Sequence, residues 1–344
     1  MTKDSRPAML LDPAPRSLAL MFRPEALTEL RSLVRLVPDE AGAPTVAQVE
    51  SLLPDVEYIM GQTDLDRRRL EKAGRLKAIF NVESNFQPNV DYDYCFQRGI
   101  HVLSVSPVFA QSVAEIGLGM ALDLARGISR GDRQFRRGEE LYGLDGNQGA
   151  FTLAGKPMGI IGFGDLGQAL YRLLAAFRGR VLVHDPWMPP GMIREVGGDP
   201  VDLETLLSES RAVFVTASVT SENEGFLGKP HFDLMANGAI FVLLSRAGVV
   251  DFDALTQEAL TGRIRVATDV FPEEPLSKAH PIRDADTAVL SAHRAGALTE
   301  AFYMMGELVL DDLRLLMKGL PPRRCKRAER ETVGRLRSRP VDKS

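Results

Sequence analysis

The chain has 344 residues, enough for two domains that each bury a core. Its hydrophobic fraction of 44%, charged fraction of 26% and net charge of −4 are typical of a soluble globular enzyme, and they give no reason to expect a nucleic acid or a membrane surface as partner. The two cysteines, Cys95 and Cys325, lie far apart and make neither a disulfide framework nor a metal cluster. We therefore expect a reducing compartment and no metal.

The two ends of the chain differ in charge but show no targeting pattern. The first residues, MTKDSRPAML, lack the apolar core of a signal peptide, and no run of 18 apolar residues predicts a transmembrane helix. We therefore expect a cytoplasmic protein. From Pro321 to Ser344 there are nine Lys or Arg residues and three acids, a net charge of about +6. We expect this basic tail to be solvated and partly disordered, with docking on a partner as the alternative.

Short apolar runs alternate with helical patterns in the first part of the chain, as in parallel α/β proteins. We expect strands at Ser17–Met21, Val56–Met60, Leu76–Asn81 and Ile100–Leu103. Between them, proline and glycine mark the ends of helices. We expect these helices at Pro24–Arg35, Asp64–Ala73 and Asp91–Arg98.

The middle of the chain holds a long apolar helix and a polar segment. The helix is expected at Ser112–Ile128, with small residues on part of its surface. Because it is apolar on most faces, it must be buried on more than one side, which favours a place between the domains and at a subunit interface. The next segment, Gly131–Gly155, is rich in glycine and charge, so we expect an excursion rather than a core element.

After residue 155 the alternation resumes and predicts six strands. They are expected at Met158–Gly162, Arg180–His184, Ala212–Thr216, Ala239–Leu244, Arg265–Asp269 and Thr287–Leu290. Six strands with helices between most of them predict a doubly wound parallel sheet, the architecture of a dinucleotide-binding domain. A last apolar helix, Glu300–Lys318, stops before Gly319 and two prolines, and its place after this domain is consistent with a return to the first domain.

A glycine turn stands at the head of the second half. Residues 158–170 read MGIIGFGDLGQAL, so a buried strand runs into GFGDLG and then into a helix, which is the context that a nucleotide-binding turn requires. Gly162 permits the tight turn, Gly164 lets the backbone approach a pyrophosphate, and Gly167 lets the helix pack close to the strand. The helix N-terminus then offers N–H groups and a partial positive charge to the phosphates.

The next strand, RVLVHDP, ends at Asp185, 18 residues after Gly167. A carboxylate at this place can accept hydrogen bonds from both ribose hydroxyls of the adenosine half and would repel a 2′-phosphate. The pattern therefore favours NAD over NADP. A structural glycine turn followed by a helix-capping Asp is the alternative.

Four charged or titratable side chains follow consecutive expected strands. Arg246 stands in FVLLSRAGVVD, Asp269 and Glu274 in ATDVFPEEPL, and His293 in LSAHRAGA. Because ligands bind outside the carboxyl ends of strands in open α/β sheets, we expect these side chains to converge on one crevice. There a guanidinium can grip a carboxylate with two parallel hydrogen bonds, and an imidazole can exchange a proton with a carbonyl or hydroxyl oxygen.

The motifs GFGDLG, SRAGVVD, DVFPEEP and SAHRAGA, in that order, resemble the D-isomer-specific 2-hydroxyacid dehydrogenases, over nearly all of residues 75–318. The resemblance implies that Arg246 meets the substrate carboxylate and carbonyl and that His293 is the acid–base group. It also implies that Glu274 pairs with His293 and that Asp269 lies near the nicotinamide. The expected enzyme is an NAD-dependent oxidoreductase that interconverts a 2-hydroxy acid and a 2-oxo acid.

The same resemblance implies a two-domain fold and a homodimer. A Rossmann-type doubly wound parallel-sheet domain, residues 112–296, is expected to be inserted into a smaller flavodoxin-like α/β substrate domain, residues 1–111 plus 297–344. Homodimerisation is expected through the insert.

Motifs and strand ends together give the expected contacts. To NAD we assign the glycine turn, the strand ends after it and the site itself: Gly162, Gly164, Asp165, Leu166, Gly167, Asp185, Pro186, Ala217, Ser218, Leu244, Ser245, Arg246, Asp269 and His293. To the substrate, a small 2-hydroxy or 2-oxo acid, we assign Ser84, Asn85, Arg246 and His293.

The substrate loop departs from the family pattern, which is usually glycine-rich. The matching segment reads NVESNFQPNVD and carries Glu83, Ser84 and Asn85. Glu83 would repel a nearby carboxylate unless it points away or bonds substrate hydroxyls. We therefore expect a polar or polyhydroxylated acid, such as hydroxypyruvate, glyoxylate or a sugar acid, with Ser84 and Asn85 in contact.

Other functions on the same fold stay open. A non-catalytic NAD(H)-sensing interaction protein, like the C-terminal-binding-protein corepressors, keeps similar residues, and a basic tail could dock on a partner. Formate or phosphite oxidation also occurs on this fold, but the Gln that usually precedes the His segment in formate dehydrogenases is not seen here. A sensor would bind NADH and turn over slowly with every oxo acid.

Overall fold

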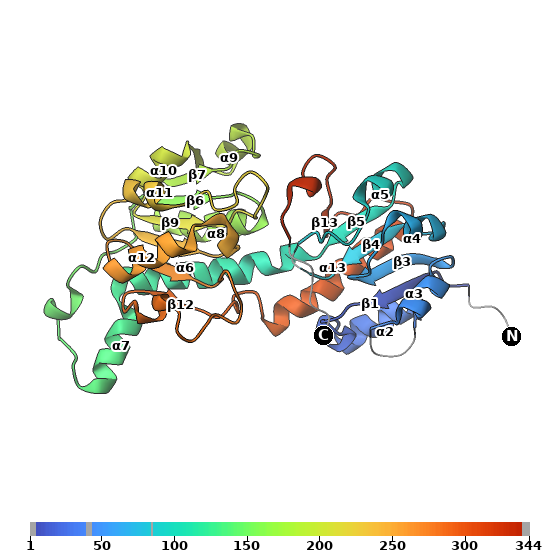
Figure 1. Ribbon diagram of the computed structural model, residues 1–344, viewed down its shortest axis with the longest axis horizontal. Coiled ribbons are helices and arrows are strands. Elements are labelled where there is room, and N and C mark those ends of the chain that lie inside the picture. Colours follow the sequence, from blue (N-terminus) through green and yellow to red (C-terminus); the bar gives the residue numbers. More distant parts are fainter. Residues whose placement is uncertain (1–4, 39–42, 84, 339–344) are drawn as a thin grey trace. The chain divides into compact units, whose positions relative to one another are not determined.

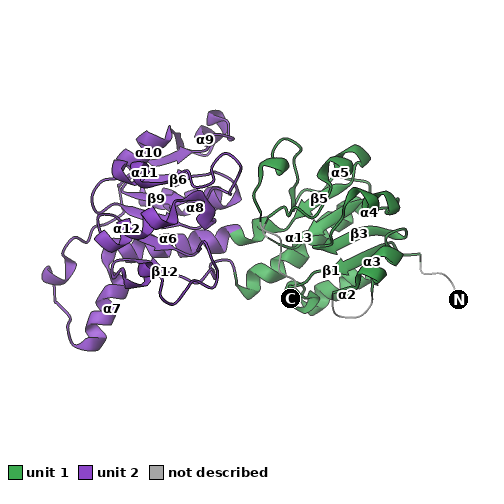
Figure 2. Ribbon diagram, in the orientation of Figure 1, with its two compact units in different colours: residues 1–109, 297–344 green, residues 110–296 purple. Residues whose placement is uncertain are grey.

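The computed structural model describes residues 5–38, 43–83 and 85–338, and the chain forms two compact units (Figure 1, Figure 2). Unit 1 combines Met1–Phe109 with Ala297–Ser344, and unit 2 is the continuous stretch Ala110–Gly296. Each unit is built on a parallel sheet of its own, so the expected α/β fold class is confirmed.

The sheet of unit 1 has the order β13-β5-β4-β3-β1-β2, with β1 to β5 parallel and β13 antiparallel to β5. The parallel order 2-1-3-4-5 is that of flavodoxin-like folds. The strands are β1 (Ala8–Asp12), β2 (Arg35–Val37), β3 (Val56–Gly61), β4 (Ala78–Asn81), β5 (His101–Ser104) and β13 (Lys326–Arg327). The α-helices are α1 (Leu18–Met21), α2 (Pro24–Leu33), α3 (Val46–Leu52), α4 (Arg67–Lys72), α5 (Tyr92–Arg98) and α13 (Thr299–Met317).

Local capping explains where helices of unit 1 begin. Thr45 Oγ1 accepts from Gln48 N at 3.2 Å and Gln48 Oε1 accepts from Thr45 N at 2.8 Å, a reciprocal capping box that starts α3. Asp66 and Asp91 cap α4 and α5, and Gly99, at φ +69°, ends α5. The capping box was a readable sign of α3, which hydrophobic periodicity alone did not predict.

The first expected strand is wrong. Ser17–Met21 contains helix α1, because Ser17 Oγ accepts a hydrogen bond from Leu20 N at 3.2 Å and caps the turn. The strand of this region is β1, whose five residues are all buried. Neither β1 nor the three-residue β2 was expected.

The basic tail is not a loose extension as far as residue 338. After α13 the chain returns to the sheet as β13, and Cys325 and Ala328 are buried. The carboxylate of Asp312, itself fully buried, accepts hydrogen bonds from the backbone N–H groups of Arg323, Arg324 and Cys325 at 2.7, 2.9 and 2.8 Å. The expectation of a partly disordered tail is therefore wrong for this part, whereas most of its residues are exposed, as expected. The many basic side chains suggested disorder, but the backbone of this segment is hydrogen-bonded to a buried carboxylate.

Asp312→Ala is expected to lower the free energy of unfolding by about 3 kcal/mol, because three backbone donors lose a buried acceptor. Urea denaturation measures the change. The neighbouring Asp311 is 41% exposed and pairs with Arg314 and Arg324, so Asp311→Ala is a matched control expected to cost less than about 1 kcal/mol. Equal losses for the two variants would contradict this role of Asp312.

The sheet of unit 2 is fully parallel, in the order β12-β11-β10-β9-β6-β7-β8. This is the doubly wound dinucleotide-binding order, reversing direction between β6 and β9. The strands are β6 (Met158–Ile161), β7 (Val181–His184), β8 (Asp199–Pro200), β9 (Ala212–Val215), β10 (Ile240–Leu243), β11 (Arg265–Thr268) and β12 (Val289–Leu290). All six expected strands are present, and β8 is a seventh, only two residues long.

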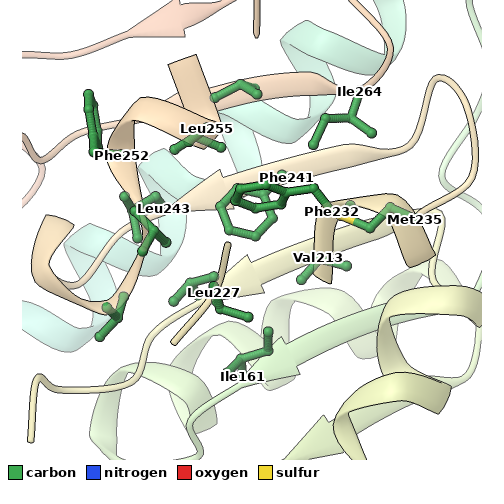
Figure 3. Close-up of a cluster of buried hydrophobic side chains, with 14 of the residues drawn as sticks. Ile161, Val213, Leu227, Phe232, Met235, Phe241, Leu243, Phe252, Leu255 and Ile264 are labelled. Atoms are coloured by element: carbon green, nitrogen blue, oxygen red, sulfur yellow. The ribbon is translucent and has the colours of Figure 1, made fainter. Parts of the chain in front are cut away.

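Helices cover both faces of this sheet and bury a core on each. On one face Phe232 and Phe241 pack edge to face, with ring centroids 5.3 Å apart, in the cluster of Figure 3. α6 and α8 pack on the other face. The helices are α6 (Ala110–Arg126), α7 (Ile128–Arg137), α8 (Asp165–Leu174), α9 (Pro190–Glu195), α10 (Leu203–Glu209), α11 (Lys229–Leu234) and α12 (Phe252–Thr261).

One helix has the length and composition of a membrane span. It covers Ser106–Arg126, so it includes α6. In unit 2, α6 packs against α8, β10 and β11, and Ala114, Met120 and Leu124 lie in the core. Its apolar composition is thus explained by burial against the sheet.

The segment after α6, residues 128–155, is here called the arm. Its first part is helix α7, in which no residue is buried, so this helix is not part of the core of unit 2, as the sequence predicted. In Figure 1, α7 and the loop after it stand away from the sheet of unit 2. Large apolar side chains on the arm are exposed: Phe135 by 62%, Leu141 by 62%, Tyr142 by 77% and Leu144 by 80%. Within unit 2 these four side chains therefore leave apolar surface exposed.

Candidate functional site

The glycine turn has the geometry that its residues predict. Gly162 has φ +90°, and a Cβ on it would lie 2.5 Å from Ala217 Cα. A Cβ on Gly167 would collide with the carbonyl oxygen of Gly162, so helix α8 packs against the turn only because residue 167 is glycine. A Cβ on Gly164 would meet nothing within 4 Å. Packing within the protein therefore requires glycine at positions 162 and 167, whereas Gly164 faces open space at the start of α8.

The start of α8 is suited to an anion. Gly164 is the N-cap of this ten-residue helix, and no side chain caps it. Asp165 and Leu166 form its first turn. The open space before Gly164 and the N–H groups of the helix start fit a dinucleotide pyrophosphate.

Asp185 holds the turn as well as the end of β7. Its Oδ2 accepts from Phe163 N at 2.6 Å, and its Oδ1 accepts from Trp187 N at 2.8 Å and Met188 N at 3.1 Å. Asp185 also lines a cavity of about 460 Å³, together with His184, Met188, Ile193, Arg194 and Asp202. The carboxylate therefore stands beside a space that could receive the adenosine half of the cofactor.

Thr216 is a site residue that the sequence analysis missed. At the end of β9, its Oγ1 donates to the carbonyls of Gly162 and Ile161, at 2.5 and 3.1 Å. A hydroxyl at a strand end next to the glycine turn was the available signal. The expected cofactor residues Ala217 and Ser218 follow directly, and Ala217 contacts Gly162.

The expected residues after β10 lie in different environments. Leu244 is 4% exposed and packs in the core beneath α6, and its N–H donates to the Val215 carbonyl at 3.1 Å, so its backbone carbonyl is the group left to meet a ligand. Ser245 Oγ is buried and has no hydrogen-bond partner among the described residues. Arg246 follows, half-buried, with Nη1 donating to the Ser245 carbonyl at 2.7 Å.

Asp269 fixes the loop that carries His293. Its carboxylate, on a residue 1% exposed, accepts from Arg294 N and Ala295 N, each at 3.1 Å. Its carbonyl accepts from His293 N at 2.7 Å. His293 itself has φ +48°, an uncommon conformation for a residue with a side chain. A strained residue held by a buried carboxylate is typical of a functional position.

The structure brings His293 and Glu274 together. His293 Nδ1 is 2.6 Å from Glu274 Oε2, while Glu274 Oε1 accepts from Phe271 N at 2.9 Å. Both residues line a cavity of about 540 Å³, with Phe271, Leu276, Arg283 and Ser291 among its other walls. With Nδ1 engaged by the carboxylate, Nε2 is the ring nitrogen left for a substrate proton.

In unit 1, part of the expected substrate loop can be placed. Ser84 lies outside the described residues. The Asn85 carbonyl accepts from Asn81 Nδ2 at 2.9 Å, Glu83 N donates to Asn81 Oδ1 at 2.8 Å, and Ser104 Oγ donates to the Glu83 carbonyl at 3.1 Å. The loop is thus pinned to the carboxyl ends of β4 and β5.

The charge of Glu83 is not free. Arg16 Nε lies 3.0 Å from Glu83 Oε1, and Arg16 Nη2 donates to Glu83 Oε2 at 3.3 Å. The expected repulsion between Glu83 and a substrate carboxylate assumed an unpaired charge, whereas the Glu83 carboxylate is paired with a guanidinium. The sequence held no sign of this pair, since the two residues are 67 positions apart.

Comparisons with known proteins decide the family. Residues 118–295 match the model of the D-isomer specific 2-hydroxyacid dehydrogenase NAD-binding domain. The chain is 33% identical to glyoxylate reductase of Thermococcus litoralis, over 75% of this chain and 79% of that one. The chain belongs to the D-isomer-specific 2-hydroxyacid dehydrogenase family. The matched residues lie inside unit 2, so unit 2 contains the NAD-binding domain of the family.

Further relatives of this family member differ in length. It is 31% identical to D-3-phosphoglycerate dehydrogenase of Archaeoglobus fulgidus, over 79% of this chain. It spans about half the length of that relative, 51%. A solved structure of a phosphoglycerate oxidoreductase from Rhizobium etli is 50% identical in sequence and has a TM-score of 0.86. The match covers 95% of this chain and 100% of that one.

Proposed function

We propose that the protein is an NAD(H)-dependent D-2-hydroxyacid dehydrogenase that interconverts a 2-hydroxy acid and a 2-oxo acid. The observation that carries the proposal is the His293–Glu274 pair beside the carboxyl edge of a doubly wound sheet whose glycine turn fits a dinucleotide. When bound, the nicotinamide supplies or accepts the hydride at C2 of the acid.

The side chains divide the remaining work. Glu274 holds Nδ1 of His293, so that Nε2 gives a proton to the carbonyl oxygen in reduction and takes it from the hydroxyl in oxidation. Arg246 binds the carboxylate of the acid and stabilises the charge that develops on the carbonyl oxygen. Asp269 positions His293 through the backbone of its loop.

We propose that the residues assigned to NAD from the sequence bind the cofactor, and that three of them do so through the backbone. Asp165 and Leu166 contribute backbone N–H groups at the start of α8, and Leu244 contributes backbone only. Asp185, followed by Pro186, accepts hydrogen bonds from the adenosine ribose and favours NADH over NADPH. Free, buried Cys95 and Cys325 suit a reducing compartment, which supports the cytoplasmic location that we propose.

The test of the function also tests the cofactor. We expect NADH oxidation with glyoxylate or hydroxypyruvate, and slower oxidation of NADPH. Asp185→Asn is expected to lower the NADH-over-NADPH ratio of kcat/KM by roughly 10-fold or more, because a neutral amide no longer repels the 2′-phosphate. Asp199→Asn, which removes a surface partner of Arg180, is the control. A ratio unchanged in Asp185→Asn would contradict the role of Asp185.

We propose a homodimer through the arm. Its exposed apolar side chains need a cover, and a second copy of the chain presents the same surface. The double variant Tyr142→Glu/Leu144→Glu is expected to be monomeric by light scattering. The control Val46→Glu changes a side chain that is 68% exposed in unit 1 and leaves the dimer intact. A monomeric wild-type protein, or a dimer that survives both glutamates, argues against this interface.

A non-catalytic NAD(H) sensor is the alternative that the sequence left open, and the relatives favour the enzyme over it, because the chain is 33% identical to a glyoxylate reductase over 75% of its length. The two functions differ in turnover. A sensor binds NADH without net consumption in the presence of every 2-oxo acid offered.

A further inference from the structure

Arg16 and Glu83 meet at the carboxyl edge of the sheet of unit 1. Arg16 lies between β1 and α1, and Glu83 follows β4. The guanidinium also lies over the ring of Phe302 of α13, 4.9 Å from its centroid. The two charged side chains are only 25% and 15% exposed. Glu83 from one side and an aromatic face from another therefore orient the guanidinium.

The contact with Glu83 is loose for an arginine–carboxylate pair. Arg16 Nε and Glu83 Oε1 are 3.0 Å apart, which is within ion-pair distance. Both atoms are buried and neither has a hydrogen-bond partner in the part of the chain that the structure describes, so they interact only as opposite charges. The one hydrogen bond, from Nη2, is 3.3 Å long, whereas charge-assisted bonds are normally shorter. Glu83 engages the Nε/Nη2 edge, and Nη1 has no partner among the described residues. The Nη1/Nη2 edge, the fork that grips a carboxylate or a phosphate, is thus left for a ligand.

We propose that Arg16 determines substrate specificity by binding a second anionic group of the acid, a carboxylate or a phosphate remote from the reacting carbon. This inference rests on the proposed function, because it takes Glu83 and Asn85 as part of the substrate loop. Asn81 and Ser104 hold the backbone of Glu83 on the sheet, and the Glu83 carboxylate contacts Arg16. The free edge of Arg16 is therefore held beside the backbone of Glu83. Glu83 neutralises Arg16 when no such group is bound.

Matched substrate pairs test the inference with the full chain and NADH. Hydroxypyruvate and its 3-phosphate differ by a phosphate, and pyruvate and oxaloacetate differ by a carboxylate. Arg16→Met is expected to lower kcat/KM for the member with the second anionic group by roughly 10- to 100-fold, mainly through KM, and to change the other member far less. Glu83→Gln is expected to act in the opposite direction, raising kcat/KM for the same members several-fold. The phosphate and carboxylate pairs show which anion the fork takes.

The alternative is that the Arg16–Glu83 pair only holds two loops together. In that case Arg16→Met and Glu83→Gln each lower kcat/KM equally for both members of a substrate pair, and that result overturns the inference. If Arg16→Met does not fold, Arg16→Lys keeps the charge without the fork and is expected to lose part of the discrimination. Calorimetric titration of the NAD⁺-loaded protein with the same 2-oxo acids, which cannot react without a hydride donor, separates the role of Arg16 from the proposed enzyme activity. An affinity loss confined to the doubly anionic members supports the role of Arg16 even without turnover, and equal affinities overturn it.

Discussion

Replacing His293 with alanine is expected to lower kcat for reduction of a 2-oxo acid by about 10²- to 10⁴-fold. The imidazole is held 2.6 Å from Glu274, and its loop is fixed by Asp269. The variant removes the proton donor and leaves the glycine turn and Asp185 untouched. Stopped-flow NADH oxidation under saturating acid measures kcat.

His231→Ala is the matched control, since that imidazole accepts a hydrogen bond from Gly228 N in the capping of α11. It is expected to keep kcat near the wild-type value. NADH binding is followed in all variants by energy transfer from Trp187, the only tryptophan of the chain, which adjoins Asp185. A His293→Ala protein that retains kcat within about 2-fold would exclude His293 as the acid–base group.

The second large effect is expected at Arg246. Arg246→Lys keeps the positive charge but loses the planar fork, so kcat/KM is expected to fall by about 10²- to 10³-fold. Both the carboxylate grip and the stabilisation of the carbonyl oxygen depend on that fork, so kcat falls and KM rises. Steady-state kinetics with one monoanionic 2-oxo acid measures both constants.

Arg294→Lys is the control for Arg246, because this exposed arginine follows His293 on the same loop. It is expected to change kcat/KM by less than about 3-fold. Similar kinetics for Arg246→Lys and the wild-type protein would mean that Arg246 does not meet the substrate.

The parts of the site that the sequence predicts well are contiguous in the chain. GFGDLG needs only a strand before it and a helix after it, and the collisions of Cβ atoms at Gly162 and Gly167 show why these residue types stand there. His293, Glu274 and Asp269 follow neighbouring strands β11 and β12, so the order of the sheet alone brings their loops together. Parallel-sheet topology turns sequence order into proximity at one edge.

The missed features depend on contacts between distant positions or on a weak pattern. The pair of Arg16 and Glu83 has no local sign, and the wrong strand at Ser17–Met21 hid the fact that Arg16 follows a strand. Helix α7 is rich in charge, and its two large apolar residues, Ile128 and Phe135, are both exposed, so the segment does not look like a core helix in the sequence. The tail is fixed by the carboxylate of Asp312, a single buried group on another element.

His293, paired with Glu274, is proposed to act as the acid–base group of a working dehydrogenase, and turnover is what separates such an enzyme from a non-catalytic NAD(H) sensor. The most direct test is NADH consumption by the purified protein with a panel of 2-oxo acids, together with chiral analysis of the product. We predict multiple turnovers, one 2-hydroxy acid formed per NADH consumed, and a product of the D configuration where the acid gives a stereocentre. Intact NADH binding, seen through Trp187, without turnover of any acid would contradict the claim and favour the sensor.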